Sequence, residues 1–247
     1  MNSATVILPY VFPEELSKLT DRLNDTMIDY IAEQDVDRIG PDMMYQKLWN
    51  KLDTDIIILH SDMLPLEDDL TNDWYTKLCL YAQQYPEAGI LGCKLLYPAY
   101  HENKLLIQYA GGKFTNGIPD HFGSGLNLDN NSVFKNLEVD EGQYDYVREV
   151  AWATFGGIYI KREVLDKVGN FDPMYEWSYN RDVDYSLEVR KLGYKIYQTP
   201  ATLLHYESKD VKRIRTQEMV EKEQRNLKRL KEKWQGSPLY QTLDKKV

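Results

Sequence analysis

The five residues at 55–59, Asp-Ile-Ile-Ile-Leu, constrain the fold more than any other part of the sequence. They lack the alternation of apolar and polar residues that marks a strand with one face in water. This pattern is typical of a central parallel strand that is covered on both faces. Parallel neighbours need long crossover connections, which are usually helices. The sequence therefore predicts an α/β architecture with a mostly parallel central sheet.

Strand-like and helix-like segments alternate along the rest of the chain, with no internal repeat and no low-complexity linker. This alternation predicts helices on both faces of the sheet, followed by a C-terminal helical extension. The stretch 111–131 is rich in glycine, asparagine and aspartate, and we expect it to form a long loop. The predicted strands lie at 5–8, 27–31, 55–59, 89–96, 106–110, 150–160 and 195–199, and the predicted helices at 13–23, 43–52, 71–85, 162–168, 184–192 and 209–234.

Charge is unevenly distributed along the chain. The formal net charge is −9, but residues 209–247 hold 12 basic and 6 acidic side chains, so they carry +6 and the preceding residues carry −15. An acidic body argues against a protein that binds the phosphate backbone of nucleic acids. If such a body handles a phosphorylated substrate, something besides its own lysines and arginines has to neutralise the phosphates.

Cysteine usage and the N-terminus indicate a cytoplasmic protein. Cys79 and Cys93 are too few for a disulfide framework and lack the spacing of zinc ligands, so we expect two reduced thiols. Residues 1–10 lack the basic and apolar regions of a signal peptide. The longest mostly apolar run, 151–160, is far shorter than the roughly 20 residues that cross a bilayer. A peripheral association with a membrane remains compatible with the sequence.

Two polar groups follow predicted strands, and open α/β sheets bind their ligands beyond the carboxyl ends of such strands. His60-Ser61-Asp62 comes directly after the strand at 55–59, and His205 comes after the last predicted strand. A carboxylate can coordinate a hard divalent cation there, and an imidazole suits manganese-like metals. The alternatives are that Asp62 caps the next turn and that His205 is an ordinary core or surface histidine.

A third polar group, Arg181-Asp182-Val183-Asp184, opens a predicted helix. Carboxylates are common at helix starts because they cap the free backbone amides. The alternative is that Asp182 faces a cleft and acts as a general base. For Asp184 we expect a capping or supporting role.

The order and separation of these groups, together with several glycine-containing segments, carry a resemblance to a known family. After the Ser-Asp at 61–62 come characteristic segments at 92–98, 107–112, 121–125, 155–162, 168–172, 181–187 and 190–194, and then His205. This succession covers roughly residues 40–206. It resembles the inverting nucleotide-sugar glycosyltransferases of family 2, and within them the rhamnosyltransferase-like branch.

The resemblance implies a GT-A fold and a role for several residues. Asp62 matches the final acid of the family's DxD motif, which holds a divalent cation (Mn²⁺ or Mg²⁺) on the donor diphosphate, and His205 matches a histidine that completes this metal site. Asp182 matches the catalytic base, which takes the proton from the acceptor hydroxyl. Gly156 and Gly157 lie where the family's chain passes close to the donor sugar, an approach that only glycine allows.

The same resemblance divides the chain into a catalytic domain, 1–207, and a basic helical tail, 208–247. Within the domain, residues 1–98 would bind the nucleotide sugar and residues 99–207 the acceptor, a saccharide, glycan or lipid-linked sugar in polysaccharide biosynthesis. The donor we expect first is deoxythymidine diphosphate-rhamnose, followed by a uridine diphosphate sugar. The tail could dock on its own domain, form a homodimer contact or lie on an anionic membrane surface.

Two positions depart from the family's pattern. His60 stands where the family has an acid, and it could still ligate manganese or indicate a weaker dependence on metal. Arg181 replaces the acid before the base, and it could pair with Asp182 or reach a phosphate or an anionic acceptor. A nucleotidyltransferase of the same fold is poorly supported, because the glycine-rich, lysine-containing phosphate loop is missing. A degenerate nucleotide- or carbohydrate-binding module remains the alternative to an enzyme.

The remaining site residues are expected on the donor and acceptor sides. Ser61 belongs to the DxD-like triplet. Pro9 and Tyr10 are the only trace of the turn that normally follows the first strand. One acid among Glu33, Asp35 and Asp37 would contact the nucleotide base, and we choose Asp35.

On the acceptor side, the candidates for binding the sugar are Arg181 and the aromatic residues Tyr175 and Trp177. Ordinary core packing is the alternative for the two aromatic residues. Trp152 could also stack on the acceptor but fits a core position as well.

Overall fold

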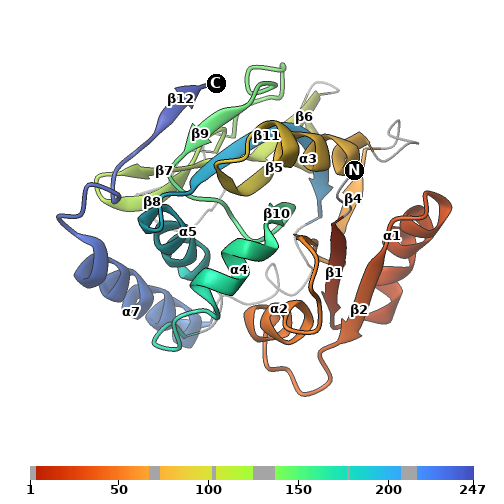
Figure 1. Ribbon diagram of the computed structural model, residues 1–247, viewed down its shortest axis with the longest axis horizontal. Helices are drawn as coiled ribbons and strands as arrows, with labels where there is room; N and C mark the ends of the chain where they lie inside the picture. Colours follow the sequence, from red (N-terminus) through yellow and green to blue (C-terminus); the bar gives the residue numbers. More distant parts are fainter. Residues whose placement is uncertain (1–3, 67–72, 102–103, 125–136, 177–178, 207–215) are drawn as a thin grey trace.

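The structure is a computed structural model, and it describes residues 4–66, 73–101, 104–124, 137–176, 179–206 and 216–247. One large sheet runs through the molecule and is covered by helices (Figure 1). Its helices are α1 (Pro13–Asp25), α2 (Pro41–Trp49), α3 (Asp73–Gln84), α4 (Arg162–Val168), α5 (Arg181–Lys191) and α7 (Gln217–Trp234). Its strands are β1 (Thr5–Tyr10), β2 (Tyr30–Gln34), β3 (Ile56–Ile58), β4 (Met63–Pro65), β5 (Ala88–His101), β6 (Lys104–Tyr109), β7 (Gly112–Thr115), β8 (Ile118–His121), β9 (Arg148–Val150), β10 (Ile158–Ile160), β11 (Lys195–His205) and β12 (Asp244–Lys246).

The central sheet has the order β12-β9-β11-β5-β10-β3-β1-β2, with β4 paired to β11 and β6 paired to β5. The pairs β1–β2, β1–β3 and β5–β11 are parallel. β10 runs antiparallel between β3 and β5, so these two strands still point in the same direction. The carboxyl ends of β1, β2, β3, β5 and β11 therefore lie at one edge of the sheet, and the predicted α/β architecture is confirmed.

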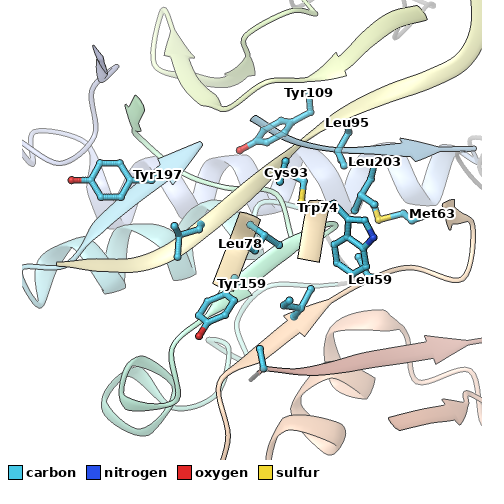
Figure 2. Packing of buried hydrophobic residues seen from close by; sticks show 14 of the residues in the cluster. Leu59, Met63, Trp74, Leu78, Cys93, Leu95, Tyr109, Tyr159, Tyr197 and Leu203 are labelled. Atoms are coloured by element: carbon cyan, nitrogen blue, oxygen red, sulfur yellow. The ribbon is translucent and has the colours of Figure 1, made fainter. Parts of the chain in front are cut away.

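β3 is buried on both faces, as its aliphatic sequence predicts. Ile57 belongs to a cluster that includes side chains of α1 and α3, whereas Ile56 and Ile58 belong to a second cluster with side chains of α2 and α4. Figure 2 shows the first cluster, in which Trp74 and Leu78 of α3 pack beside Leu59 and the strand residues around it. Successive residues of a strand point to opposite faces, so this strand needs an apolar residue at every position.

The loop expected at 111–131 is in part a β-hairpin. β7 and β8 pair antiparallel, and the turn between them is Asn116-Gly117. Both residues have positive φ, 52° and 69°, which is the conformation that tight hairpin turns require and that Asn-Gly adopts readily. The hairpin corrects the loop prediction over 112–121, and residues 125–131 lie outside the described part of the chain.

The C-terminal residues pack against the body of the molecule. α7 lies beside α5 (Figure 1), and Leu230 and Trp234 on one of its faces are buried. Trp234 Nε1 and Lys233 Nζ donate hydrogen bonds to the buried Asp184 carboxylate, which gives this residue its supporting role. Beyond α7, β12 joins the sheet next to β9. The sequence did not predict β12. Of the three alternatives for the tail, docking on its own domain is the one the structure contains.

We expect Trp234→Ala to weaken this docking strongly. The indole is 5% exposed, so its removal leaves a cavity and takes one hydrogen bond from Asp184. Truncating a buried tryptophan costs about 3–5 kcal/mol, which lowers the Tm of a chain of this size by about 6–20 °C. Thermal unfolding followed by circular dichroism measures the effect. Lys228→Ala on the exposed face of the same helix is the control, and a Tm change of Trp234→Ala no larger than that of the control would contradict the docking.

Candidate functional site

The three predicted metal ligands meet at the carboxyl edge of the sheet. His60 and Asp62 follow β3, and His205 is the last residue of β11, where it pairs with Met63 of β4. His205 Nε2 lies 3.4 Å from Asp62 Oδ1, and one ligand atom from each of the three residues lies within 4.8 Å of the others. His60 and His205 are far apart in the sequence, and the order of the strands in the sheet brings them together.

The electrostatics of this cluster favour an ionised carboxylate and a neutral imidazole. Burial opposes ionisation of Asp62, but its hydrogen bond to His205 and the nearby imidazoles outweigh this effect and lower its pKa. Burial and the neighbouring His205 lower the pKa of His60 to about 4. An anionic oxygen and imidazole nitrogens with free lone pairs are the donor set of a manganese-like cation. Ligands on adjacent positions of one such ion are about 3 Å apart, which fits the separation of Asp62 and His205.

His60 is held by other groups as well. Its Nε2 lies 2.6 Å from the Tyr45 hydroxyl, and its ring also makes a hydrogen bond to the backbone of Phe155. Asp62 and His205 therefore offer the more accessible ligand atoms, and His60 would join them only by exchanging its contact with Tyr45. Tyr45 lies on α2 and is 1% exposed. Sequence reasoning missed it, because a tyrosine on the inner face of a helix has the pattern of an ordinary core residue.

Asp182 lies in the first turn of α5, after the left-handed Asn180 (φ 65°). Its Oδ1 accepts a hydrogen bond from the Val183 amide, as an acid at a helix start commonly does. Burial and the charge of Asp42 raise its pKa to about 7, although hydrogen bonds from Val183 and Thr154 act in the opposite direction. A carboxylate with a pKa near neutrality is suited to take up a proton at physiological pH.

Arg181 is bound by groups other than Asp182. Its Nη1 lies 3.2 Å from Asp42 Oδ2, and its Nε donates to the Tyr175 carbonyl at 3.1 Å. Among the residues that the structure describes, it forms no ion pair with Asp182. Burial raises the pKa of Asp42 to about 7, and Arg181 limits this rise. Asp42 is another residue that the sequence did not reveal, since an acid directly after Pro41 has the pattern of a helix start.

The Tyr45 hydroxyl connects the metal cluster with Asp182. Burial raises its pKa, and the charges of Asp42, Asp62 and Asp182 raise it further. Asp182 also makes a hydrogen bond to Thr154, and the next residue, Phe155, makes a backbone hydrogen bond to His60. The candidate base and the candidate metal ligands therefore lie on either side of the segment 154–155. They come from α2, α5 and the carboxyl ends of β3 and β11.

The predicted donor-side residues lie along the same edge. Tyr10 ends β1 with a partly exposed side chain, whereas Pro9 is buried. Asp35 follows β2, and its two carboxylate oxygens accept hydrogen bonds from the amides of Ile39 and Gly40, both at 2.9 Å. This carboxylate thus closes the loop before α2.

Gly156, Gly157 and Ser61 lie next to the metal cluster. A Cβ on Gly156 would come within 2.4 Å of Met63 Cε and 3.2 Å of His60 Cε1, so a larger residue would have to displace the Met63 side chain and crowd the histidine. Gly157, directly before β10, has φ +69° and lies close to side chains of the hydrophobic core. Ser61 lies between the two residues of the cluster and is partly exposed.

The structure places the predicted acceptor residues in different environments. Tyr175 is 2% exposed, and its hydroxyl donates to Asp184 at 3.1 Å, so burial of its ring removes it from the acceptor-binding residues we propose. Trp152 is also a core residue, with its Nε1 bound to the Lys113 carbonyl. The Arg181 guanidinium is bound to the Tyr175 carbonyl and to Asp42. Trp177 lies outside the described residues.

No protein-family model matches this sequence. The chain is 29% identical over 164 residues to the uncharacterized protein y4gI of Sinorhizobium fredii (strain NBRC 101917 / NGR234). The aligned region covers 66% of this chain and 17% of that protein. It is 26% identical over 155 residues to the O-antigen biosynthesis protein RfbC of Myxococcus xanthus. This aligned region covers 62% of the chain and 11% of RfbC. The chain therefore spans less than a fifth of the length of these curated relatives.

A solved structure of similar fold is that of GalNAc-T7 with UDP, GalNAc and Mn²⁺. It superposes with a TM-score of 0.59 at 12% sequence identity, and the match covers 82% of this chain and 43% of GalNAc-T7. At this identity the likeness concerns the fold alone. Within the described residues, no helix is long and apolar enough to cross a membrane. The GT-A fold that the sequence resemblance implies is confirmed.

Proposed function

We propose that this chain is a glycosyltransferase that moves a sugar from a nucleoside diphosphate to the hydroxyl of a saccharide acceptor, with inversion at the anomeric carbon. The observation that carries the proposal is the single site around Tyr45. It combines a carboxyl group of near-neutral pKa, Asp182, with the cluster of His60, Asp62 and His205. A proton acceptor beside a cation-binding cluster is what direct displacement of a diphosphate requires.

In this mechanism Asp182 takes the proton of the acceptor hydroxyl as the oxygen attacks the anomeric carbon. The bond between that carbon and the diphosphate breaks, and the diphosphate leaves with the electron pair. Asp62 and His205 would hold a divalent cation, which supplies positive charge to the leaving diphosphate when bound. Gly156 lets its segment lie close to His60, and burial together with the charge of Asp42 raises the pKa of Asp182 to about 7.

The comparisons support the substrate classes in this proposal. RfbC is named for O-antigen biosynthesis, which agrees with a glycan or lipid-linked acceptor in polysaccharide assembly. GalNAc-T7 was solved with UDP, a sugar and Mn²⁺, which agrees with a nucleotide-sugar donor and a divalent metal. The rhamnosyltransferase-like resemblance makes deoxythymidine diphosphate-rhamnose the donor we propose first. We propose a cytoplasmic location, and peripheral contact with a membrane is the alternative setting.

The second candidate is a degenerate module that binds nucleotides or carbohydrates without transfer. The contact between His60 and Tyr45 favours the degenerate module, because the Tyr45 hydroxyl occupies Nε2 of His60, a nitrogen that an active metal site could use. Release of nucleoside diphosphate from a panel of donors, with and without Mn²⁺, decides between the two. The proposed function predicts metal-stimulated release with one donor and a matching saccharide acceptor. Binding of a donor without release under any condition would support the degenerate module.

We expect the activity to increase with pH up to about pH 7 and Asp42→Asn to shift this limb downward. Asp182 accepts a proton only when it is ionised, and its pKa of about 7 is raised in part by the charge of Asp42. Removing that charge lowers the pKa of Asp182, so the acid limb of kcat/KM moves to lower pH. Asp21→Asn, on the exposed face of α1, is the matched control. An unchanged profile in Asp42→Asn would contradict the electrostatic role of Asp42.

A further inference from the structure

Gln108 makes a close contact with one of the metal-cluster residues. Its Oε1 lies 2.7 Å from Nδ1 of His205, and its side chain is buried, with 9% of the residue exposed. An amide oxygen only accepts hydrogen bonds, so the proton of this contact has to reside on Nδ1 of the imidazole. Nε2 is then the nitrogen of His205 that faces Asp62 Oδ1, at 3.4 Å.

The backbone around Gln108 is irregular at this point. β6 pairs with β5, but Ile107 lies opposite Leu96 and Tyr109 lies opposite Leu95, so Gln108 is an extra residue on its strand. Such a β-bulge redirects a side chain out of the regular alternation, and bulges are frequent beside active sites. The Gln108 carbonyl accepts a hydrogen bond from the Ser124 hydroxyl at 2.7 Å, which helps to hold the bulge.

With Nδ1 held by Gln108, Nε2 is the nitrogen of His205 that can act as a metal ligand beside the Asp62 carboxylate. A cation bound between these two atoms would take the place of a proton on Nε2. Histidines that bind metals almost always donate their other N–H to an oxygen, which fixes both the tautomer and the ring orientation. Gln108 is in the position of that oxygen.

We propose that Gln108 is a positioning residue that keeps His205 in its Nδ1–H form and directs Nε2 toward a divalent cation shared with Asp62. This role rests on the metal site of the proposed function. The bulge in β6 supplies the geometry, and the amide oxygen supplies a neutral acceptor. Leucine at position 108 has a similar volume but no acceptor, whereas glutamate keeps an acceptor.

The test measures the affinity of the full chain for Mn²⁺ alone, from the loss of the electron paramagnetic resonance signal of free Mn²⁺. We expect Gln108→Leu to bind Mn²⁺ about 10–100-fold more weakly than the wild type, and Gln108→Glu to bind at least as tightly. Gln198→Leu is the matched control. Gln198 is buried on β11, its amide donates to the Thr199 carbonyl, and its Oε1 has no partner, so we expect this variant to keep the wild-type affinity.

A second measurement follows the tautomer directly and needs no metal. Nitrogen-15 NMR of the metal-free protein at pH 8, above the ordinary imidazole pKa of about 6.5, should show His205 protonated on Nδ1 in the wild type but not in Gln108→Leu. Equal Mn²⁺ affinity of wild type and Gln108→Leu, or an Nε2–H wild type, would overturn the role of Gln108 and leave the metal site standing. A wild type that does not bind Mn²⁺ would overturn the metal site itself, and with it the role of Gln108.

Discussion

We expect Asp182→Asn to abolish sugar transfer while binding of the donor survives. The amide cannot take up the acceptor proton, and loss of a general base typically costs a factor of about 10²–10⁴ in rate. Asparagine has the shape of aspartate and can still accept the hydrogen bond from the Val183 amide, so the start of α5 should stay intact. Nucleoside diphosphate release measures transfer, and calorimetry with the same nucleoside diphosphate measures binding.

The same variant has an opposite effect on stability that checks the environment of Asp182. Its pKa is raised in the folded state, so the stability of the wild type decreases as the pH increases from about 4 to about 7. Asp182→Asn is free of this penalty, and we expect its Tm to exceed that of the wild type by about 4–8 °C at pH 8. This is about half of what the full pKa shift implies, because Asp182 is partly exposed and solvent screens its charge. At pH 4 the difference should vanish.

Glu163→Gln is the control for both measurements. Glu163 also lies in the first turn of a helix, α4, but its side chain is 52% exposed. We expect wild-type transfer and wild-type stability from this variant. Full turnover by Asp182→Asn would remove Asp182 from the role of base.

Asp62→Ala has the second large effect, a loss of metal-dependent donor binding. The Asp62 carboxylate would be the anionic ligand of the cluster, and its hydrogen bond to His205 and the nearby imidazoles lower its pKa, so the charge that would attract a cation is present at neutral pH. Without it we expect Mn²⁺ to bind about 100-fold more weakly, and Mn²⁺ to stop improving the affinity for UDP or deoxythymidine diphosphate. Calorimetric titrations with and without Mn²⁺ measure both quantities.

Asp53→Ala, an exposed acid before the opposite end of β3, is the control for this prediction. It lowers the net negative charge by the same amount, so it separates a local loss of a ligand from a general electrostatic effect. If both variants retained the wild-type response to Mn²⁺, Asp62 would not be a metal ligand.

The sequence predicts the parts of this molecule that depend on local pattern. The aliphatic run at 55–59 predicts a strand buried on both faces, and the structure confirms it. The polar residues after β3 and β11 also come together as predicted, because parallel strands end at the same edge of a sheet. The Asn116-Gly117 hairpin had a local signal too, which the abundance of polar residues around it obscured.

The supporting residues of the site have no local signal. Tyr45 and Asp42 fit the ordinary pattern of an amphipathic helix that begins at Pro41, and their contacts with His60 and Arg181 depend on how α2 packs. Gln108 is placed by a bulge, which exists only in the pairing of β6 with β5. Residues of this kind are specified by tertiary packing and become visible only in three dimensions.

The structure also explains part of the uneven charge. The basic C-terminal helix places Arg225 and Arg229 on Glu176, and Lys233 contacts Asp172 and Asp184. The positive tail therefore neutralises acids of its own body near the segment that leads to Asp182.

The most direct test of the account is a calorimetric titration of the wild-type chain with UDP and with deoxythymidine diphosphate, each with and without Mn²⁺. We expect at least one of them to bind and Mn²⁺ to tighten this binding, because Asp62 and His205 would hold the cation that neutralises the diphosphate. If neither nucleoside diphosphate binds under any of these conditions, the assignment of this site to nucleotide-sugar transfer is contradicted.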